Sequence, residues 1–276
     1  MQNCKDARCD TNLKQFSQAT SDNTVSILRG AGCVYAEEEA ALLVAEAKTS
    51  VELAFMTASR ASGLPLEHIL GWAEFCGLRI AVGPGVFVPR RRTEFLVREA
   101  VACTPQGGAI VLDLGCGSGA LGAVILAQIK DVSLYAADIE PEAVRYARRN
   151  LTDSGGHVYE SDLFESLPDS LRGHIDTIVA NMPYVPTDSI EFLPAEARLH
   201  EPLVTLDGGA DGLALHRRVA AAALSWLAPS GHLLIETSRA QATAAVKIFR
   251  QNGLATRVAR NNELEATVII GTKPAG

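Results

Sequence analysis

The sequence has no apolar run near the ~20 residues that a transmembrane helix needs, because the longest ones, 108–114 and 121–127, are soon interrupted. Its first 26 residues lack the apolar centre of a signal peptide, which disfavours secretion. Six cysteines, at positions 4, 9, 33, 76, 103 and 116, form no Cys-x-x-Cys pair, and no histidine lies at zinc-finger spacing from them. These absences predict a cytoplasmic protein with reduced thiols, no membrane span and no metal site.

The chain also lacks a surplus of positive charge. Lys plus Arg is 25 and Asp plus Glu is 32, so the net charge is 25 − 32 = −7. Because binding to a phosphate backbone depends on Lys and Arg, this balance disfavours a nucleic-acid partner. At 47% hydrophobic and 21% charged residues, the 276-residue chain has a globular composition and length for one large or two unequal domains.

The residue pattern divides the chain into four segments. Residues 1–23 are polar and predict a flexible leader, and 24–74 carry apolar residues at helical spacing, typical of a small helical domain. Residues 75–90 alternate β-type residues with glycines and predict a hairpin linker. Residues 91–276 then form the larger domain.

Short apolar runs alternate with helical patterns in the larger domain. Strands are predicted at 109–114, 133–137, 157–161, 177–180 and 232–236, and helices at 120–129, 140–151, 213–227 and 239–251. This alternation is typical of an α/β fold with a parallel sheet covered by helices on both faces. The closely spaced segments 256–260 and 265–271 predict a terminal hairpin that adds one antiparallel strand.

The first strand of this domain ends in Asp-Leu-Gly-Cys-Gly-Ser-Gly, residues 113–119. Glycines at this point allow positive φ and let a ligand approach the backbone, at the sheet edge where α/β proteins bind ligands. Asp138 ends the next strand, where a carboxylate can accept hydrogen bonds from ribose hydroxyls. Because Gly115-x-Gly117-x-x-Ala120 also satisfies the dinucleotide fingerprint, the spacing indicates a nucleoside site without naming the cofactor.

The whole Asp113–Gly119 segment resembles the first motif of class I S-adenosylmethionine-dependent methyltransferases. The resemblance implies a Rossmann-like, seven-stranded domain and S-adenosyl-L-methionine as cofactor, with S-adenosyl-L-homocysteine as product. Ser-Asp-Leu-Phe at 161–164 resembles the adenine-contacting segment of the same families. The cofactor-binding residues implied are Asp113, Gly115, Cys116, Gly117, Gly119, Asp138, Ile139, Asp162, Leu163 and Asn181.

Asn181-Met182-Pro183-Tyr184 follows the fourth predicted strand, where a side chain would face the cofactor. Methyl transfer mainly requires a nucleophile aligned behind an activated carbon with water excluded. The Asn181 carbonyl and the Met182 backbone carbonyl can hold both hydrogens of a planar NH₂ group, while Pro183 restricts Met182 to extended backbone. Tyr184 offers a ring face for stacking. Asn181, Pro183 and Tyr184 are therefore the candidate catalytic residues.

The tetrapeptide resembles the Asn-Pro-Pro-Tyr motif of methyltransferases that act on planar nitrogens. Together with segments 63–71, 87–94, 201–202 and 206–212, it makes most of the chain similar to the HemK/PrmC release-factor glutamine methyltransferases. The resemblance implies a helical N-terminal domain, a hairpin and a methyltransferase domain, with a glutamine loop of a protein as substrate. Two departures, Met182 and the Arg-Arg-Arg-Thr-Glu run at 90–94, are closer to a related subgroup. The substrate-binding residues implied are Phe87, Arg90, Met182, Tyr184 and Tyr35.

Several alternatives stay open at this point. A flexible Met182 side chain would suit a small planar N-heteroaromatic acceptor, such as an indole-type metabolite, in the same clamp. Adenine methylation in nucleic acid is disfavoured by the net charge, and a non-enzymatic cofactor sensor by the Asn-x-Pro-Tyr pattern. Tyr35 could be an ordinary core aromatic, and Arg90–Arg92 a solvated basic run. The pattern assigns no general base and no oligomeric state.

Overall fold

The computed structural model describes residues 16–275, and these form two compact units. Of these residues, one unit holds 16–71 together with Ala195–His200, and the other holds Trp72–Pro194 and 201–275. Within the described residues, no helix combines the length and the apolar character needed to cross a membrane.

The first unit is helical. Leu28, Leu43 and Leu53 come from three different helices and pack in its core. Helix α1 begins inside the segment predicted as a leader, because the Ser17 hydroxyl accepts a hydrogen bond from the Thr20 N–H and caps it; residues 1–15 lie outside the described residues. The helices are α1 (Gln18–Gly30), α2 (Ala36–Glu46), α3 (Ser50–Ala61), α4 (Leu66–Leu70) and α8 (Ala195–His200).

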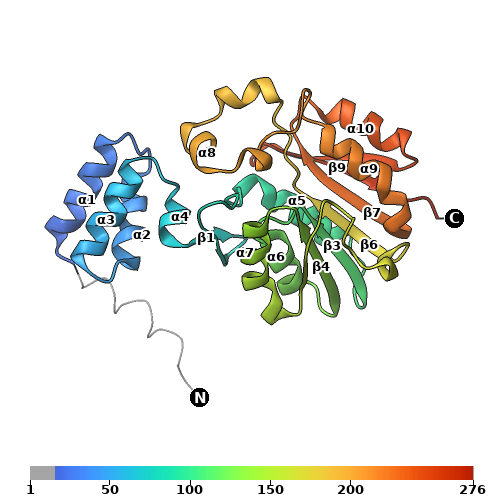
Figure 1. The fold of residues 1–276 in the computed structure, drawn as a ribbon, viewed down its shortest axis with the longest axis horizontal. Helices are drawn as coiled ribbons and strands as arrows, with labels where there is room; N and C mark the ends of the chain where they lie inside the picture. Colours follow the sequence, from blue (N-terminus) through green and yellow to red (C-terminus); the bar gives the residue numbers. More distant parts are fainter. Residues whose placement is uncertain (1–15, 276) are drawn as a thin grey trace, which may run out of the picture. The chain divides into compact units, whose positions relative to one another are not determined.

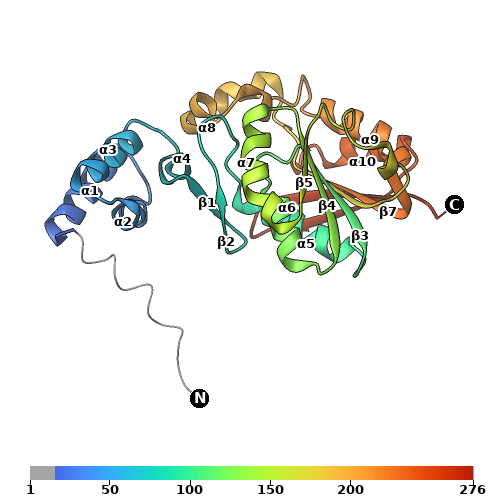
Figure 2. The same cartoon turned by 60° about the horizontal axis from the view of Figure 1, so that its bottom comes forward.

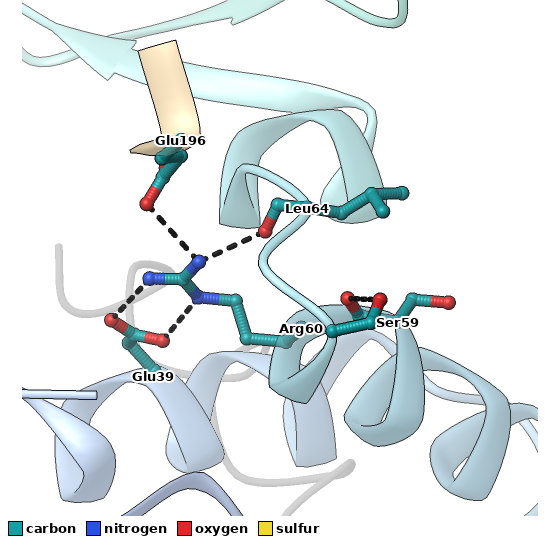
Figure 3. Close-up of polar contacts among 6 residues, drawn as sticks. Glu39, Ser59, Arg60, Leu64 and Glu196 are labelled. Atoms are coloured by element: carbon teal, nitrogen blue, oxygen red, sulfur yellow. Dashed lines mark hydrogen bonds and ion pairs between the residues drawn. The ribbon is translucent and has the colours of Figure 1, made fainter. Parts of the chain in front are cut away.

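A nearly buried Arg60 ties four segments of this unit together (Figure 3). Its Nε and Nη2 donate to the two carboxylate oxygens of Glu39 on α2, at 2.6 and 3.1 Å. Its Nη1 donates to the Leu64 carbonyl at 2.9 Å and to Glu196 on α8 at 3.2 Å. The planar guanidinium thus joins α8, from far along the chain, to the helices of the N-terminal region.

The second unit is built on a seven-stranded sheet in the order β5-β4-β3-β6-β7-β9-β8. All neighbouring strands are parallel except at β9, which runs antiparallel to both β7 and β8. This confirms the predicted α/β fold with one antiparallel strand, placed there by the terminal hairpin. The strands are β3 (Ala109–Leu114), β4 (Val132–Asp138), β5 (His157–Glu160), β6 (Ile175–Ala180), β7 (Leu227–Thr237), β8 (Ala255–Asn261) and β9 (Ala266–Thr272).

Helices cover both faces of this sheet, as Figure 1 and Figure 2 show. Along β3, Val111 packs with α5, α6 and α7, whereas Leu112 and Leu114 pack with α9 and α10 on the other face. Each face therefore has its own apolar core, as alternating side chains of a buried strand require. The helices are α5 (Glu94–Cys103), α6 (Ala120–Gln128), α7 (Pro141–Leu151), α9 (Ala214–Trp226) and α10 (Ala242–Gln251). Short 3-10 turns are η1 (Arg91–Thr93), η2 (Thr152–Ser154), η3 (Asp169–Leu171), η4 (Thr187–Phe192) and η5 (Leu203–Thr205).

Several elements differ from the predicted positions. Helix α5 was not predicted, because its first residue, Glu94, is also the last residue of the motif-rich segment 87–94. Strand β7 begins at Leu227 rather than at 232, and the register shift between Ile175 and Thr177 of β6 accommodates the extra residues. The hairpin begins with β1 (Trp72–Phe75), three residues before the predicted linker, and its second strand β2 (Leu78–Ala81) lies inside that linker.

Asn150 on α7 connects this hairpin to the glycine-containing loop that follows β3. Its side-chain oxygen accepts from the Ala81 N–H at 2.9 Å. Its Nδ2 donates to the carbonyls of Ala81 and Ser118, at 2.9 and 2.8 Å. One side chain thereby satisfies three backbone groups and holds β2 beside the loop.

We expect Asn150→Ala to lower the free energy of unfolding by about 1–3 kcal/mol, because it leaves partly buried backbone groups without partners. The urea-induced unfolding transition of the second unit measures this change in free energy. The neighbouring exposed residue provides the matched control, Arg149→Ala, which should stay within about 0.5 kcal/mol of the wild type. Equal stabilities for the two variants would contradict the connecting role of Asn150.

Candidate active site

The loop between β3 and α6 turns through Gly115, Gly117 and Gly119, which have φ of 66°, 54° and 78°. The Gly115 N–H donates to the Ala137 carbonyl at 2.8 Å and ties the loop to β4. A Cβ at Gly119 would lie 2.9 Å from Cδ1 of Leu151 on α7. The loop thus needs glycine for its left-handed turns and for its close approach to α7.

Asp138 ends β4 beside this loop. Its Oδ2 accepts from the Gly117 N–H at 2.8 Å, and its Oδ1 accepts from the Glu140 N–H at 3.0 Å. Burial raises its pKa, while these two backbone N–H groups oppose the rise. Each carboxylate oxygen keeps a second lone pair, so the predicted contact with ribose hydroxyls fits the hydrogen bonds already present.

Asp113 is fully buried on the α6 side of β3. Its Oδ2 accepts from the Gly122 N–H at 3.0 Å, near the start of α6. Its Oδ1 has no hydrogen-bond partner within residues 16–275. Burial raises the pKa of this carboxyl to about 7, and the charge of Asp138 adds to the rise. Asp113 therefore fixes the start of α6 through its Oδ2, and its Oδ1 can accept a further hydrogen bond.

The remaining predicted cofactor residues lie around the ends of β3, β4 and β5. Cys116 is buried, and burial raises the pKa of its thiol. Ile139 is half exposed directly after β4. Asp162 forms an ion pair with Arg218 of α9 at 2.9 Å, and Leu163 has a positive φ of 52°. Because β3, β4 and β5 are parallel neighbours, the segments that follow them meet at one edge of the sheet.

The tetrapeptide at 181–184 lies at this same edge. Ala180, the last residue of β6, pairs with Leu114, the last of β3, so Asn181 follows β6 where the glycine loop follows β3. The Asn181 Nδ2 donates to the Thr93 hydroxyl at 3.3 Å. The Met182 side chain is buried, and a Cβ at Gly115 would lie 3.0 Å from its Cε. Met182 therefore contributes a side chain to the core, which leaves its backbone carbonyl as the group available to a substrate.

The segment 206–212 packs against the backbone of Pro183 and Tyr184. A Cβ at Gly208 would lie 2.8 Å from the Pro183 carbonyl oxygen, and one at Gly212 would lie 2.2 Å from that of Tyr184. The same Tyr184 carbonyl accepts a hydrogen bond from Gln241 Nε2 at 2.9 Å. The glycines of this segment thus let two backbone stretches approach closely and hold the tetrapeptide in place.

Glu236, near the end of β7, is a site residue that sequence reasoning missed. It is buried, and its Oε1 accepts from the Tyr184 hydroxyl at 2.9 Å and lies 3.3 Å from Nε of Arg92. Burial raises the pKa of Glu236, and burial together with the Glu236 charge raises that of Tyr184. The signal for this residue in the sequence is a carboxylate that directly follows the apolar run Leu-Leu-Ile at 233–235.

Phe87 and Arg90 belong to a segment fixed by another buried carboxylate. Arg90 Nη2 lies 2.5 Å from Glu201 Oε1, and the same oxygen accepts from the Val88 N–H at 3.3 Å. The Arg90 Cζ lies 4.9 Å from the centre of the Phe87 ring. Arg90 is thus an anchor of this segment, and its direct contact with substrate stays a prediction.

Tyr35 is the last of the predicted substrate-binding residues, and the lack of a metal site is the other prediction that remains. Tyr35 precedes α2 in the helical unit with 67% of its surface exposed, so it is not a core aromatic. Within the described part of the chain, no group of three or more His, Cys, Asp or Glu side chains could hold a metal ion. The arrangement offers backbone N–H groups, carboxylates and an amide around one sheet edge, which suits positioning of a nucleoside and a planar polar group.

Comparisons by sequence agree on one kind of protein. A family model of the methyltransferase small domain matches residues 78–200. A release factor glutamine methyltransferase from Geobacter sulfurreducens is 40% identical over 200 residues, which span 72% of this chain and 69% of the relative. One from Mycolicibacterium smegmatis is 35% identical over 211 residues, spanning 76% of this chain and 74% of the relative.

Comparisons by structure show the same fold at lower identity. A methyltransferase from Pyrococcus furiosus superposes with a TM-score of 0.55 at 17% identity, over 72% of this chain and 91% of that one. The 16S rRNA N2 G1207 methyltransferase of T. thermophilus, solved with AdoMet and guanosine, has a TM-score of 0.51 at 20% identity, over 73% of this chain and 49% of that one. These two likenesses concern the fold alone.

The buried Asp113 predicts a pH dependence of stability. Its ordinary pKa of 3.8 applies in the unfolded chain, and its pKa in the folded protein is about 7. Between these values the folded protein keeps a proton that the unfolded chain releases, so the contribution of Asp113 to stability is lost as the pH rises from 4 to 7.

We expect Asp113→Asn, which keeps an acceptor for the Gly122 N–H, to flatten this fall. Between pH 5 and 6.5 the unfolding free energy of the variant should fall less steeply with pH than that of the wild type. The two slopes should differ by about 1.4 kcal/mol per pH unit. Urea denaturation at a series of pH values, without added ligand, measures both slopes. Parallel curves for the two proteins would contradict the raised pKa.

Proposed function

Because the chain belongs to the release factor glutamine methyltransferase family and is a methyltransferase enzyme, we propose that it methylates the side-chain amide nitrogen of a glutamine in a release factor. The cofactor is S-adenosyl-L-methionine, and S-adenosyl-L-homocysteine is the second product. The observation that carries the proposal is 40% identity over more than two thirds of a relative of that name, with Asn181 at the end of β6. The reduced cysteines of the described chain fit a cytoplasmic setting.

The cofactor fits the residues at the carboxyl ends of β3 and β4. The left-handed glycine loop leaves its backbone open to close approach, and Asp138 has lone pairs directed at that loop. The unpartnered Oδ1 of Asp113 supplies a further buried acceptor for a cationic group. When bound, S-adenosylmethionine supplies a methyl group on a sulfonium centre, which is an electrophilic carbon with a good leaving group.

The tetrapeptide is proposed to hold the acceptor amide. The Asn181 Oδ1 and the Met182 carbonyl accept the two N–H groups of the glutamine side chain, which fixes the amide plane. Hydrogen bonds to both N–H groups increase electron density on the nitrogen, and alignment supplies much of the rate enhancement. As the N–C bond to the methyl carbon forms, the bond between that carbon and the sulfonium sulfur would break and leave a neutral thioether; the nitrogen would then lose one N–H proton to water. The Tyr184 ring borders the same site, and the hydrogen bond from its hydroxyl to Glu236 holds it there.

The other acceptors have less support. A heteroaromatic metabolite was favoured by a flexible Met182 side chain in the pocket, but that side chain is buried against the glycine loop. Adenine in nucleic acid is opposed by the net charge of −7. A release factor, by contrast, matches the names of the relatives aligned over most of this chain.

The first test is the transfer reaction itself. We expect the purified protein, incubated with S-adenosylmethionine and a bacterial release factor, to add one methyl group to the glutamine of a Gly-Gly-Gln loop. Peptide mass spectrometry locates the modification, and a release factor with that glutamine replaced by alanine serves as the control. A protein that binds S-adenosylmethionine tightly but leaves release factors from several bacteria unmodified would overturn the proposal.

The second test separates acceptor positioning from cofactor binding. We expect Asn181→Ala to lower kcat by about 100-fold or more with little change in the Kd for S-adenosylmethionine, because the acceptor loses its alignment. Asp138→Ala should weaken cofactor binding by about 10- to 100-fold, because charge-assisted hydrogen bonds are lost. Calorimetry and single-turnover assays measure the two effects. Unchanged turnover in the first variant, or an unchanged Kd in the second, would refute the assigned role.

A further inference from the structure

Three consecutive arginines stand where this chain departs from the family pattern, and the structure gives each of them different surroundings. Arg90 anchors its own segment to a buried glutamate, as described above. Arg91 is exposed, and its side chain forms no hydrogen bond or ion pair within residues 16–275. Arg92 follows in the same turn, η1, and its Nε lies 3.3 Å from Oε1 of Glu236. Of the last two arginines, only Arg92 therefore contacts a buried carboxylate.

The register of the sheet places Glu236 at the level of the tetrapeptide. Ile235 of β7 pairs with Ala180, the last residue of β6, so Glu236 follows Ile235 where Asn181 follows Ala180. The Glu236 side chain is only 2% exposed, and its Oε1 accepts a hydrogen bond from the Tyr184 hydroxyl at 2.9 Å. The last residue of the tetrapeptide is thus joined to β7 through its side chain.

Arg92 contacts both members of this pair. Its Nε approaches the same Glu236 oxygen that accepts from the Tyr184 hydroxyl. Its Cζ lies 5.7 Å from the centre of the Tyr184 ring, within the range of about 6 Å in which a cation is attracted to an aromatic face. A carboxylate removed from water is costly unless an opposite charge compensates it. Arg92 supplies that charge, which opposes the rise that burial causes in the pKa of Glu236.

The charge on Glu236 matters for the place of the Tyr184 ring. An ionised carboxylate has no hydrogen to donate, so it serves the Tyr184 hydroxyl as an acceptor only, and it is a stronger acceptor than a neutral group. A tyrosine side chain has two rotatable torsions, and a hydrogen bond at its far end restricts both. The backbone carbonyl of Tyr184 accepts from Gln241 Nε2 at 2.9 Å. The residue is therefore held at its backbone and at its hydroxyl.

We propose that Arg92 is a positioning residue, which keeps Glu236 ionised and thereby holds the Tyr184 ring where it borders the acceptor amide. The inference rests on the proposed function for the identity of that acceptor. It also separates the three arginines of the run. Arg90 anchors its segment, Arg92 acts through Glu236 on Tyr184, and Arg91 has no part in the site.

The neighbouring arginines give matched variants for a kinetic test. We expect Arg92→Gln to lower kcat by about 10-fold or more, because the ring beside the acceptor loses its fixed position. The KM for the release factor and the Kd for S-adenosylmethionine should both stay within about 3-fold of the wild type. Arg91→Gln makes the same change in net charge and should leave kcat within about 2-fold.

A conservative variant tests whether the charge of Arg92 is what matters. Arg92 approaches Glu236 through Nε, the guanidinium nitrogen nearest its backbone, so the shorter side chain of a lysine can bring its ammonium to the same carboxylate. We expect Arg92→Lys to recover kcat to within about 3-fold of the wild type. An Arg92→Lys enzyme as impaired as Arg92→Gln, or an Arg92→Gln enzyme as active as Arg91→Gln, would overturn the inference.

A double-mutant cycle tests whether Arg92 acts through the Tyr184 hydroxyl. Tyr184→Phe keeps the ring and removes the group that bonds to Glu236. In that background we expect Arg92→Gln to lower kcat by about 3-fold or less, whereas independent effects would multiply. The same 10-fold loss or more in both backgrounds would contradict a path through Tyr184.

A spectroscopic readout separates this inference from the identity of the acceptor. Protein labelled with ¹³C at the tyrosine Cζ gives one signal for each of its 5 tyrosines, and the signal of Tyr184 is the one lost in Tyr184→Phe. This signal reports the hydrogen bond of the hydroxyl, so it should move in Arg92→Gln and Glu236→Gln and stay in place in Arg91→Gln. The other tyrosine signals should keep their positions, which shows that each variant is folded.

The two proposals can then fail separately. If the Tyr184 signal moves as expected while the wild type methylates no glutamine, the positioning role of Arg92 stands and the proposed function fails. If the wild type is active and the Tyr184 signal is the same in all folded variants, the proposed function stands and the positioning role fails.

Discussion

Three left-handed glycines in the loop after β3 set the geometry on which the rest of the site depends. Residues with a Cβ rarely adopt such φ values, and Gly119 also lies too close to Leu151 for any side chain. The turn brings the Gly117 N–H to Asp138 and lets Met182 pack under Gly115. The glycine loop, Asp138 and the tetrapeptide can therefore lie close together at one edge of the sheet, since the glycines let other residues approach the loop backbone.

Hydrogen bonds and ion pairs of buried and half-buried side chains hold several backbone segments around this loop. Asn150 pairs with backbone of the hairpin and the loop, Glu201 holds the Arg90 segment, and Gln241 bonds to the Tyr184 carbonyl. An unpaired polar group in the interior is costly, so each of these pairs restricts where its backbone can lie. The hydrogen bonds that Asn181 donates to Thr93 and that Tyr184 donates to Glu236 extend this control from the backbone to two side chains of the tetrapeptide.

The residue pattern of the larger domain predicted the order of its strands and helices well, because buried parallel strands are continuous apolar runs that alternate with amphipathic helices. It missed α5, whose sequence was interpreted as part of a motif, and it placed Met182 in the pocket. A methionine after an asparagine carries no signal of the direction of its side chain, since its packing against Gly115 depends on the pairing of two strands whose partner residues are 66 positions apart in the chain. Glu236 was missed for the same reason, because its partners come from η1 and from the tetrapeptide.

Local chemistry sufficed for what the sequence alone determined, which is an α/β domain after a helical one. It also led to two predictions, a nucleoside site at the first glycine loop and an asparagine clamp for a planar nitrogen. These features depend on residues that are close in the chain, where spacing and conformational preference act directly. Only the tertiary structure decided that Met182 belongs to the core, that Arg90 is held by Glu201, and that the buried Glu236 carboxylate accepts a hydrogen bond from Tyr184. Those outcomes depend on which side chains meet across the sheet edge, and hydrogen-bond partners far apart in the chain are set by the packing of strands and not by local sequence.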